Sequence, residues 1–226
     1  MYRKYIKRLL DIVLALFLIV VLSPILIIIS LLIKLDSKGP VLFKQKRSGK
    51  NNKIFTLYKF RSMTCNNDFY DTTKEDQVTK IGNILRKTSL DELPQMINIL
   101  KGDMSFIGPR PWVVDYAKYF TPKQMRRLEV LPGITGLAQC SGRNNLNIID
   151  RINIDVNYVD NISFKLDVEI VFKTILCILK REGFSNSKSA IHDELRTLKE
   201  QGKEKIKKHI NKVNIKEEKE LVGSGV

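Results

Sequence analysis

The longest hydrophobic run in the chain covers residues 9–33, and Ser23-Pro24 interrupts it near its middle. A helix of about 20 apolar residues crosses the hydrocarbon core of a bilayer, so this run is long enough to cross a membrane. Proline lacks the N–H that a helix needs and clashes with the preceding turn, so Pro24 predicts a kink. The pattern therefore predicts an apolar helix that is broken at its centre.

Basic residues flank this run on both sides. They are Arg3, Lys4, Lys7 and Arg8 before it, and Lys34, Lys38, Lys44, Lys46 and Arg47 after it. Positive charge marks the cytoplasmic side of a membrane segment, and here both ends carry it. A reentrant helix that turns at Ser23-Pro24 satisfies both ends, because each half rises only about 18 Å. The Ser23 hydroxyl could then bond a carbonyl that Pro24 leaves free. A kinked single-pass anchor is the alternative.

The remaining pattern predicts one hairpin and several helices. Residues 41–64 alternate around a Gly-Lys-Asn-Asn turn, which favours a hairpin. Apolar residues at helical spacing predict helices near 78–87, 90–100, 113–128, 148–160 and 167–181. The last has Asp167 as a candidate N-cap, and its apolar stripe suits either a core helix or one lying in a membrane interface. We expect a compact, mostly helical α/β head.

The chain divides into three segments by composition. Residues 1–36 form the membrane helix, residues 37–185 the head, and residues 186–226 a charged tail, helical or disordered. Apolar residues recur at helical spacing in this tail and are interrupted near Gly202. The pattern therefore leaves three interpretations of the tail. It is a surface for self-association, which would give a homodimer; or it is a basic surface helix; or it is a solvated tail.

Charge narrows the class of partner. The chain has 39 Lys and Arg against 24 Asp and Glu, a formal net charge of +15. Such a charge suits nucleic acid, an anionic membrane surface or a polyanionic substrate. The apolar run favours the last two, and the aromatic–basic interleaving of single-strand binders is missing, so no nucleic acid is expected. Cys65, Cys140 and Cys177 form no CxxC or metal spacing, which fits a reducing cytoplasmic setting.

The strongest candidate for chemistry is Ser89-Leu90-Asp91-Glu92. Ser-x-x-Glu is also a capping box, in which Ser89 caps a helix and Glu92 reaches back to its N–H. In that register Pro94 falls past the first turn, where its missing N–H costs a hydrogen bond. We therefore expect an irregular helix start that presents the carboxylates of Asp91 and Glu92 rather than using them as caps.

Cations surround this carboxylate pair in the sequence: Lys59, Arg61, Arg86, Arg110 and Arg143. A helix N-terminus keeps Asp91 ionised and attracts phosphate. Adjacent carboxylates suit Mg²⁺, or Mn²⁺, bridged to substrate phosphates, and an ionised aspartate can also attack phosphorus. Two prolines flank Arg110 and fix its direction for a bidentate phosphate contact. For any one of these arginines taken alone, a solvated surface charge is the favoured interpretation.

Four segments in order resemble the small monotopic phosphoglycosyl transferases of the bacterial polyprenyl-phosphate sugar-1-phosphate transferase family. They are the Ser-Pro-broken N-terminal run, YKFRSM, SLDELPQMINILKGDMSFIGPRP and PGITGLAQCSGRN. The resemblance covers about residues 1–185. It implies a monotopic membrane protein with a reentrant helix hinged at Ser23-Pro24 and interfacial amphipathic helices. It also implies contact with membrane lipids at the cytoplasmic face of the bacterial inner membrane.

The resemblance further implies a catalytic Asp91-Glu92 dyad with Mg²⁺. Asp91 would attack the β-phosphate of a UDP-sugar and release UMP, and the phosphosugar would pass to undecaprenyl phosphate. This is the first membrane step of glycoconjugate synthesis. The five cations named above match positions expected to hold phosphates. Leu137 replaces a Trp that is common in the family, and Cys140-Ser141-Gly142-Arg143 replaces Val-Asn-Gly-Arg, so these departures concern substrate contacts rather than the dyad.

Two other functions are compatible with parts of the sequence. A membrane glycosyltransferase would move the sugar without its phosphate and release UDP instead of UMP. A non-enzymatic basic membrane module would explain the charge, but not a carboxylate pair set between Gly- and Pro-rich segments.

Overall fold

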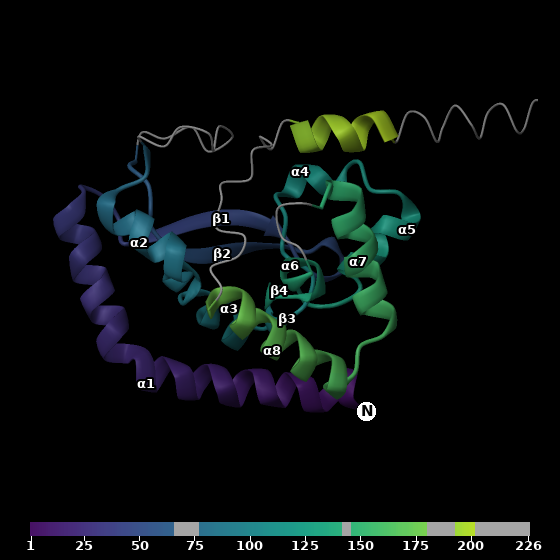
Figure 1. Cartoon of the computed structure of the whole chain (residues 1–226), viewed down its shortest axis with the longest axis horizontal. Helices are drawn as coiled ribbons and strands as arrows, with labels where there is room; N and C mark the ends of the chain where they lie inside the picture. The colour runs from purple at the N-terminus through teal and green to yellow at the C-terminus, as the bar shows by residue number, and fades with distance from the viewer. Residues whose placement is uncertain (66–76, 142–145, 180–192, 202–226) are drawn as a thin grey trace, which may run out of the picture.

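The computed structural model describes residues 1–65, 77–141, 146–179 and 193–201 (Figure 1). Its elements in chain order are η1 (Tyr2–Ile6), α1 (Lys7–Asp36), β1 (Leu42–Ser48), η2 (Lys50–Asn52), β2 (Ile54–Phe60), α2 (Lys80–Thr88), η4 (Leu90–Glu92), α3 (Gln95–Lys101), β3 (Ser105–Ile107), α4 (Val114–Ala117), α5 (Pro122–Met125), η5 (Arg126–Leu128), β4 (Gly133–Thr135), α6 (Leu137–Cys140), α7 (Ile148–Asp160) and α8 (Phe164–Leu179). Residues 193–201 are also helical. The prediction of a mostly helical α/β protein is confirmed.

Helix α1 is bent near its middle but stays helical throughout (Figure 1). Pro24 lies inside it, and the Ser23 hydroxyl donates a 2.8 Å hydrogen bond to the carbonyl of Val20. Val20 is four residues before Pro24, so its carbonyl is the one that loses an N–H partner to proline. Within the described residues, Tyr2–Asp36 is the one helix long and apolar enough to cross a membrane. The predicted kink and hydroxyl bond are confirmed.

A buried carboxylate fastens the first half of α1 to the head. Lys7 Nζ and Tyr2 OH each donate to Asp167 Oδ2 at 2.6 Å, and Tyr158 OH donates to Asp167 Oδ1 at 2.8 Å. The prediction of Asp167 as an N-cap is therefore wrong. Helix α8 begins at Phe164, and the Ser163 hydroxyl caps it by accepting from the Leu166 amide. Asp167 is instead a link between α1, α7 and α8.

A buried arginine fastens the second half of α1. The guanidinium of Arg61 donates to the carbonyls of Ile33, Ser37 and Lys38, and Arg61 is only 6% exposed. These carbonyls lie at the end of α1, where a helix has no partners of its own for its last C=O groups. Ile33 also packs against Phe60 in a shared core cluster. Both halves of α1 are thus held by polar contacts as well as by packing.

Strands β1 and β2 form the predicted hairpin. They pair antiparallel from Leu42↔Phe60 to Ser48↔Ile54, and two asparagines with positive φ form the turn. Asn98 of α3 is fully buried under β2, where its Oδ1 accepts from the Tyr58 amide at 3.0 Å and its Nδ2 donates to the Thr56 carbonyl at 2.7 Å. This side chain fixes α3 against the strand that carries Lys59.

The predicted helix over residues 113–128 is wrong, because the structure has three short helices there, α4, α5 and η5. Thr121 is the N-cap of α5, forms a capping box with Gln124, and is followed by Pro122 in the first turn. A proline in that position starts a helix rather than continuing one. The predicted helix near 148–160 is confirmed as α7.

The short parallel pair β3–β4 brings two glycine-rich loops together. Ser105 pairs with Gly133, and Ile107 pairs with Thr135. A Cβ on Gly133 would lie 2.1 Å from the Gly108 amide nitrogen, so this close approach requires glycine. The pair sets the start of the Gly-Pro-Arg-Pro segment, residues 108–111, beside β4.

The helical segment 193–201 packs onto the head through Leu198, which is fully buried in a core cluster with Trp112, Tyr116 and Ile152. Figure 1 shows this segment on the side of the head away from the first half of α1. The rest of the predicted tail lies outside the described residues, and self-association stays a prediction.

Candidate active site

The Asp91-Glu92 dyad lies in an irregular connection between two helices. Helix α2 ends at Thr88, Ser89 adopts a left-handed conformation with φ 58°, and the 3₁₀ turn η4 precedes α3. In the described part of the chain the Ser89 side chain caps neither helix, and Pro94 occupies the N-cap position of α3. The predicted irregular start is confirmed, and both carboxylates are left for other contacts.

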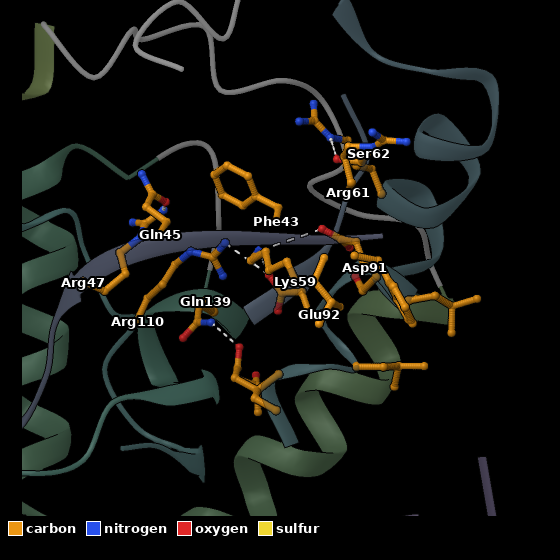
Figure 2. Close-up of a pocket in the computed structure, with 18 of the residues that line it drawn as sticks. Phe43, Gln45, Arg47, Lys59, Arg61, Ser62, Asp91, Glu92, Arg110 and Gln139 are labelled. Carbon is orange, nitrogen blue, oxygen red and sulfur yellow. Dashed lines mark hydrogen bonds and ion pairs between the residues drawn. The ribbon is translucent and has the colours of Figure 1, made fainter. Parts of the chain in front are cut away.

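Two cations from separate elements converge on Glu92 (Figure 2). Lys59 of β2 places Nζ 2.6 Å from Glu92 Oε1 and 3.9 Å from Asp91 Oδ2. Arg110 places Nη2 3.3 Å from the same Glu92 oxygen. The side chains of Asp91 and Glu92 are 13% and 16% exposed, so these ion pairs are only weakly screened by water.

The environment separates the two carboxyl groups. Burial acts to raise the pKa of Glu92, but the charges of Lys59 and Arg110 and their hydrogen bonds outweigh it and lower the pKa to about 2. At Asp91 burial is the largest effect and raises the pKa. The positive charge of Lys59 acts to lower this pKa, whereas the negative charge of Glu92 raises it further. Glu92 is thus an anion at neutral pH that contacts both cations, and Asp91 is the more basic carboxylate.

A buried ion pair supports the loop that presents Arg110. Arg127 Nη2 donates to the Arg110 carbonyl at 2.8 Å and to Asp155 Oδ2 at 2.6 Å. The Arg127 guanidinium also lies over the Trp112 ring, 4.1 Å from its centroid. The Arg110 side chain is 47% exposed and turns toward the dyad (Figure 2). The sequence predicted a rigid Pro-Arg-Pro segment, and the structure adds the Arg127–Asp155 pair behind it.

The other predicted cations have different surroundings. Arg86 of α2 lines the cavity beside the dyad, its Nε donates to Ser62 Oγ at 2.9 Å, and its charge acts on Asp91. Arg61 lines the same cavity, but its guanidinium bonds the end of α1, a capping role that the sequence did not predict. Arg143 lies outside the described residues. Phosphate binding by all five cations stays a prediction.

One open cavity of about 1180 Å³ contains the dyad. Its wall runs from Leu18 of α1 and Ile178 of α8, past Asp91 and Glu92, to Glu194 of the segment 193–201. In the part of the chain that the structure describes, no group of three or more His, Cys, Asp or Glu side chains could hold a metal. Any metal here would therefore need further ligands from a substrate or from water.

Sequence reasoning missed three cations of this cavity, Lys44, Arg47 and Arg151. Arg47 donates to Gln45 Oε1 at 2.5 Å and to the Pro111 carbonyl at 3.2 Å (Figure 2). Burial lowers the pKa of Arg47 to about 10, and the nearby charge of Arg110 adds to this effect. The sequence identified Arg47 only as a flanking charge of the apolar run. The signal available was its spacing, because Gln45 and Arg47 are two residues apart and so share one face of the predicted strand.

Residues 2–181 match the sequence model of the bacterial sugar transferases. The chain belongs to the bacterial sugar transferase family. The family resemblance stated from the sequence is therefore confirmed. The segment 193–201 of this bacterial sugar transferase lies beyond the matched residues.

Three relatives illustrate the range of the family. An uncharacterized sugar transferase EpsL of Bacillus subtilis is 46% identical over 183 residues, 80% of this chain and 91% of that one. A UDP-glucose:undecaprenyl-phosphate glucose-1-phosphate transferase of Caulobacter vibrioides is 40% identical over 189 residues, 78% of this sugar transferase and 71% of that one. A UDP-N-acetylgalactosamine-undecaprenyl-phosphate N-acetylgalactosaminephosphotransferase of Aeromonas hydrophila is 44% identical over 189 residues, 79% of this chain and 45% of that one.

Proposed function

We propose that the protein transfers a sugar-1-phosphate from a UDP-sugar to undecaprenyl phosphate and releases UMP, the first step of polysaccharide synthesis. Two relatives at 40% and 44% identity carry names that describe such transfers. The observation that carries the proposal is the dyad: two carboxylates with opposite pKa shifts, contacted by Lys59 and Arg110 in one cavity. The names of these relatives specify different sugars, so the donor is tested as a panel of UDP-sugars.

The proposed chemistry has two displacements at one phosphorus. An Asp91 carboxylate oxygen attacks the β-phosphorus, the bond to the oxygen bridging the α-phosphorus breaks, and UMP leaves with that electron pair. An oxygen of undecaprenyl phosphate then attacks the same phosphorus, and the bond to Asp91 breaks and regenerates the carboxylate. The raised pKa of Asp91 favours this role, because a more basic carboxylate is a better nucleophile.

Glu92 holds the two cationic side chains that this transfer requires. Its carboxylate fixes Lys59 Nζ and Arg110 Nη2 at one point beside Asp91. Phosphoryl transfer depends mainly on positioning and on stabilising the charge of the phosphoryl oxygens. We assign Lys59 and Arg110 to those oxygens and Glu92 to keeping both cations in place before the substrate binds.

The dyad fits a divalent metal that arrives with a diphosphate. The Asp91 carboxylate accepts no hydrogen bond within the described residues, and its contact with Lys59 is as long as 3.9 Å, so its oxygens are available as hard ligands. Asp91 and Glu92 would hold Mg²⁺ or Mn²⁺, which would neutralise diphosphate charge when bound. Two carboxylates are too few to complete the coordination of a metal by protein alone. Mg²⁺ in proteins is commonly coordinated by one or two carboxylates together with substrate phosphates and water.

We further propose that α1 is reentrant and that the protein is monotopic, at the cytoplasmic face of the bacterial inner membrane. Support comes from the bend at Pro24, the basic residues at both ends of α1, and the exposed apolar residues of α1 and α8. Helix α8 would then lie in the interface with Phe172 and Leu179 toward lipid.

The test is a product assay with purified protein, undecaprenyl phosphate and a panel of UDP-sugars. We expect UMP from at least one UDP-sugar, with none from an Asp91→Asn variant. UDP instead of UMP would identify a glycosyltransferase. No nucleotide product from any UDP-sugar would favour a non-enzymatic membrane module.

A further inference from the structure

The helical segment 193–201 forms part of the cavity wall although it lies beyond the family-matched residues. Leu198 is fully buried between α4 and α7, and Gln124 Nε2 of α5 donates to Gln201 Oε1 at 2.9 Å. An apolar anchor and a polar contact together fix the position of this segment on the head. Glu194 lies one turn before Leu198, so it is presented from a fixed base.

Glu194 joins two residues that line the same cavity as the dyad. Tyr116 OH donates to Glu194 Oε2 at 2.6 Å, and Arg151 Nη2 donates to Glu194 Oε1. All three side chains are buried or largely buried: Tyr116 is 4% exposed, and the side chains of Glu194 and Arg151 are 14% and 25% exposed. An ion pair this well shielded restrains an arginine far more than a surface pair does.

The two ends of the cavity differ in chemistry. The end at α1 and α8 is bordered by Leu18 and Ile178 and adjoins the exposed apolar surface of both helices. The other end is lined by Gln45, Arg47, Tyr116, Arg151 and Glu194. Arg47 forms no ion pair with the described residues, and Glu92 acts on its charge only at longer range, so this polar end keeps a positive charge that no carboxylate contacts directly.

This difference assigns the ends to the two substrates of the proposed reaction. The polyprenyl chain of the acceptor has to stay with the apolar surface of α1 and α8, so the acceptor reaches the dyad from that end. The nucleotide part of the donor is polar and anionic and arrives from water. Arginines recognise phosphates by charge-assisted hydrogen bonds, which suits the polar end.

We infer that the segment 193–201 is part of the UDP-sugar site, and that Glu194 is a positioning residue that holds Arg151 and Tyr116 for the nucleotide part of the donor. This inference rests on the proposed function. Without the Glu194 carboxylate, Arg151 keeps its place on α7 but loses the partner that fixes its side chain. The Arg151 side chain then has to be ordered when the donor binds, and this ordering costs rotamer entropy. The affinity for the donor therefore falls, while the Asp91-Glu92 dyad is unchanged.

The test compares Glu194→Gln with Glu200→Gln in the full-length protein. Glu200 is on the same segment, is 64% exposed and pairs with Arg196, and it does not line the cavity, so its variant removes the same charge at an exposed position. For Glu194→Gln we expect about a ten-fold rise in the KM for the UDP-sugar, with kcat within about two-fold, as for one lost charge-assisted contact. The KM for undecaprenyl phosphate stays unchanged. UDP binding measured by calorimetry weakens by the same factor, and Glu200→Gln matches the wild type throughout.

A second variant keeps the test decisive if Glu194→Gln folds poorly. Leu198→Ala removes the apolar anchor of the segment and leaves Glu194 intact, so it too should raise the KM for the UDP-sugar. Equal KM and UDP affinity for Glu194→Gln and Glu200→Gln would overturn the inference, as would a loss of kcat at unchanged KM. A wild-type protein that releases no UMP but binds UDP in a Glu194-dependent way would overturn the proposed function alone.

Discussion

The Arg127–Asp155 ion pair offers a way to separate the stability of the head from its activity. The two side chains are 1% and 3% exposed, and Arg127 Nη2 lies 2.6 Å from Asp155 Oδ2. Asp155→Ala removes the carboxylate and leaves the buried guanidinium, within the described residues, with one hydrogen-bond acceptor, the Arg110 carbonyl, and its contact with the Trp112 ring. Breaking a buried pair from one side costs about 3–5 kcal/mol, because the charge that is left is uncompensated. That is a large part of the stability of a typical domain, about 5–15 kcal/mol.

A neighbouring pair supplies the control. Arg126 Nη2 lies 2.5 Å from Asp160 Oδ1, but these side chains are 42% and 44% exposed. Exposed pairs contribute about 0–1 kcal/mol, so Asp160→Ala should change stability by less than about 1 kcal/mol. These two pairs, on adjacent arginines and with similar N–O distances, differ greatly in burial. The measurement is thermal unfolding of the purified protein in detergent, with UMP release recorded on the same samples.

A double variant distinguishes positioning from folding. Replacing both partners by apolar residues, Arg127→Met with Asp155→Leu, removes the buried charges together and should restore most of the lost stability. The Arg110 carbonyl would still lack its donor, and Trp112 its guanidinium. We therefore expect turnover to stay about ten-fold or more below the wild type, as for about 1.4 kcal/mol of lost transition-state stabilisation. Wild-type turnover in the double variant would refute the positioning role, and equal unfolding temperatures for Asp155→Ala and Asp160→Ala would refute the buried-pair estimate.

Three further predictions concern the dyad and α1. With UDP-sugar and no polyprenyl phosphate, intact mass spectrometry should show a sugar-phosphate adduct on the wild type and none on Asp91→Asn; near-normal turnover of this nearly isosteric variant would exclude covalent catalysis. Chelation of divalent metal with EDTA should abolish UMP release and Mg²⁺ should restore it, since the dyad would otherwise repel a diphosphate; full activity in EDTA would exclude a metal. Cysteines introduced at Arg3 and Lys38 should be labelled from the same side of the membrane, and Pro24→Ala should shift α1 toward spanning because it restores a hydrogen bond; labelling from opposite sides in the wild type would establish a single-pass anchor.

The sequence predicted those features that depend on neighbours along the chain. The hairpin follows from alternation and a short turn, the bend of α1 from Ser23-Pro24, and the irregular dyad from Pro94 beside Ser89. The break in the predicted helix 113–128 was also readable, since Thr121-Pro122 with Gln124 is a helix start. Propensity and capping act over a few residues, so they are visible without the fold.

The roles of individual arginines could not be predicted in this way. Arg61 finds its partners in Ile33 and Ser37, and Arg127 finds its own in Asp155, 28 residues away. In sequence these arginines are equivalent charges, and only the tertiary fold separates a helix cap from a loop support. Glu194 was likewise one charge in a charged tail, because nothing local indicates that it contacts Tyr116, 78 residues earlier.

The contacts that hold the start of α1 against the head also set an order of assembly during synthesis. Lys7 bonds Asp167 across 160 residues of chain, and Arg8 bonds the Ile99 carbonyl across 91. A ribosome adds about 5–20 residues per second, so α1 is complete for about 7–26 s before Asp167 exists. In the topology proposed here, the bilayer covers the apolar surface of α1 throughout this interval. The nascent helix therefore inserts first, and the head completes its fold against a helix already held by lipid.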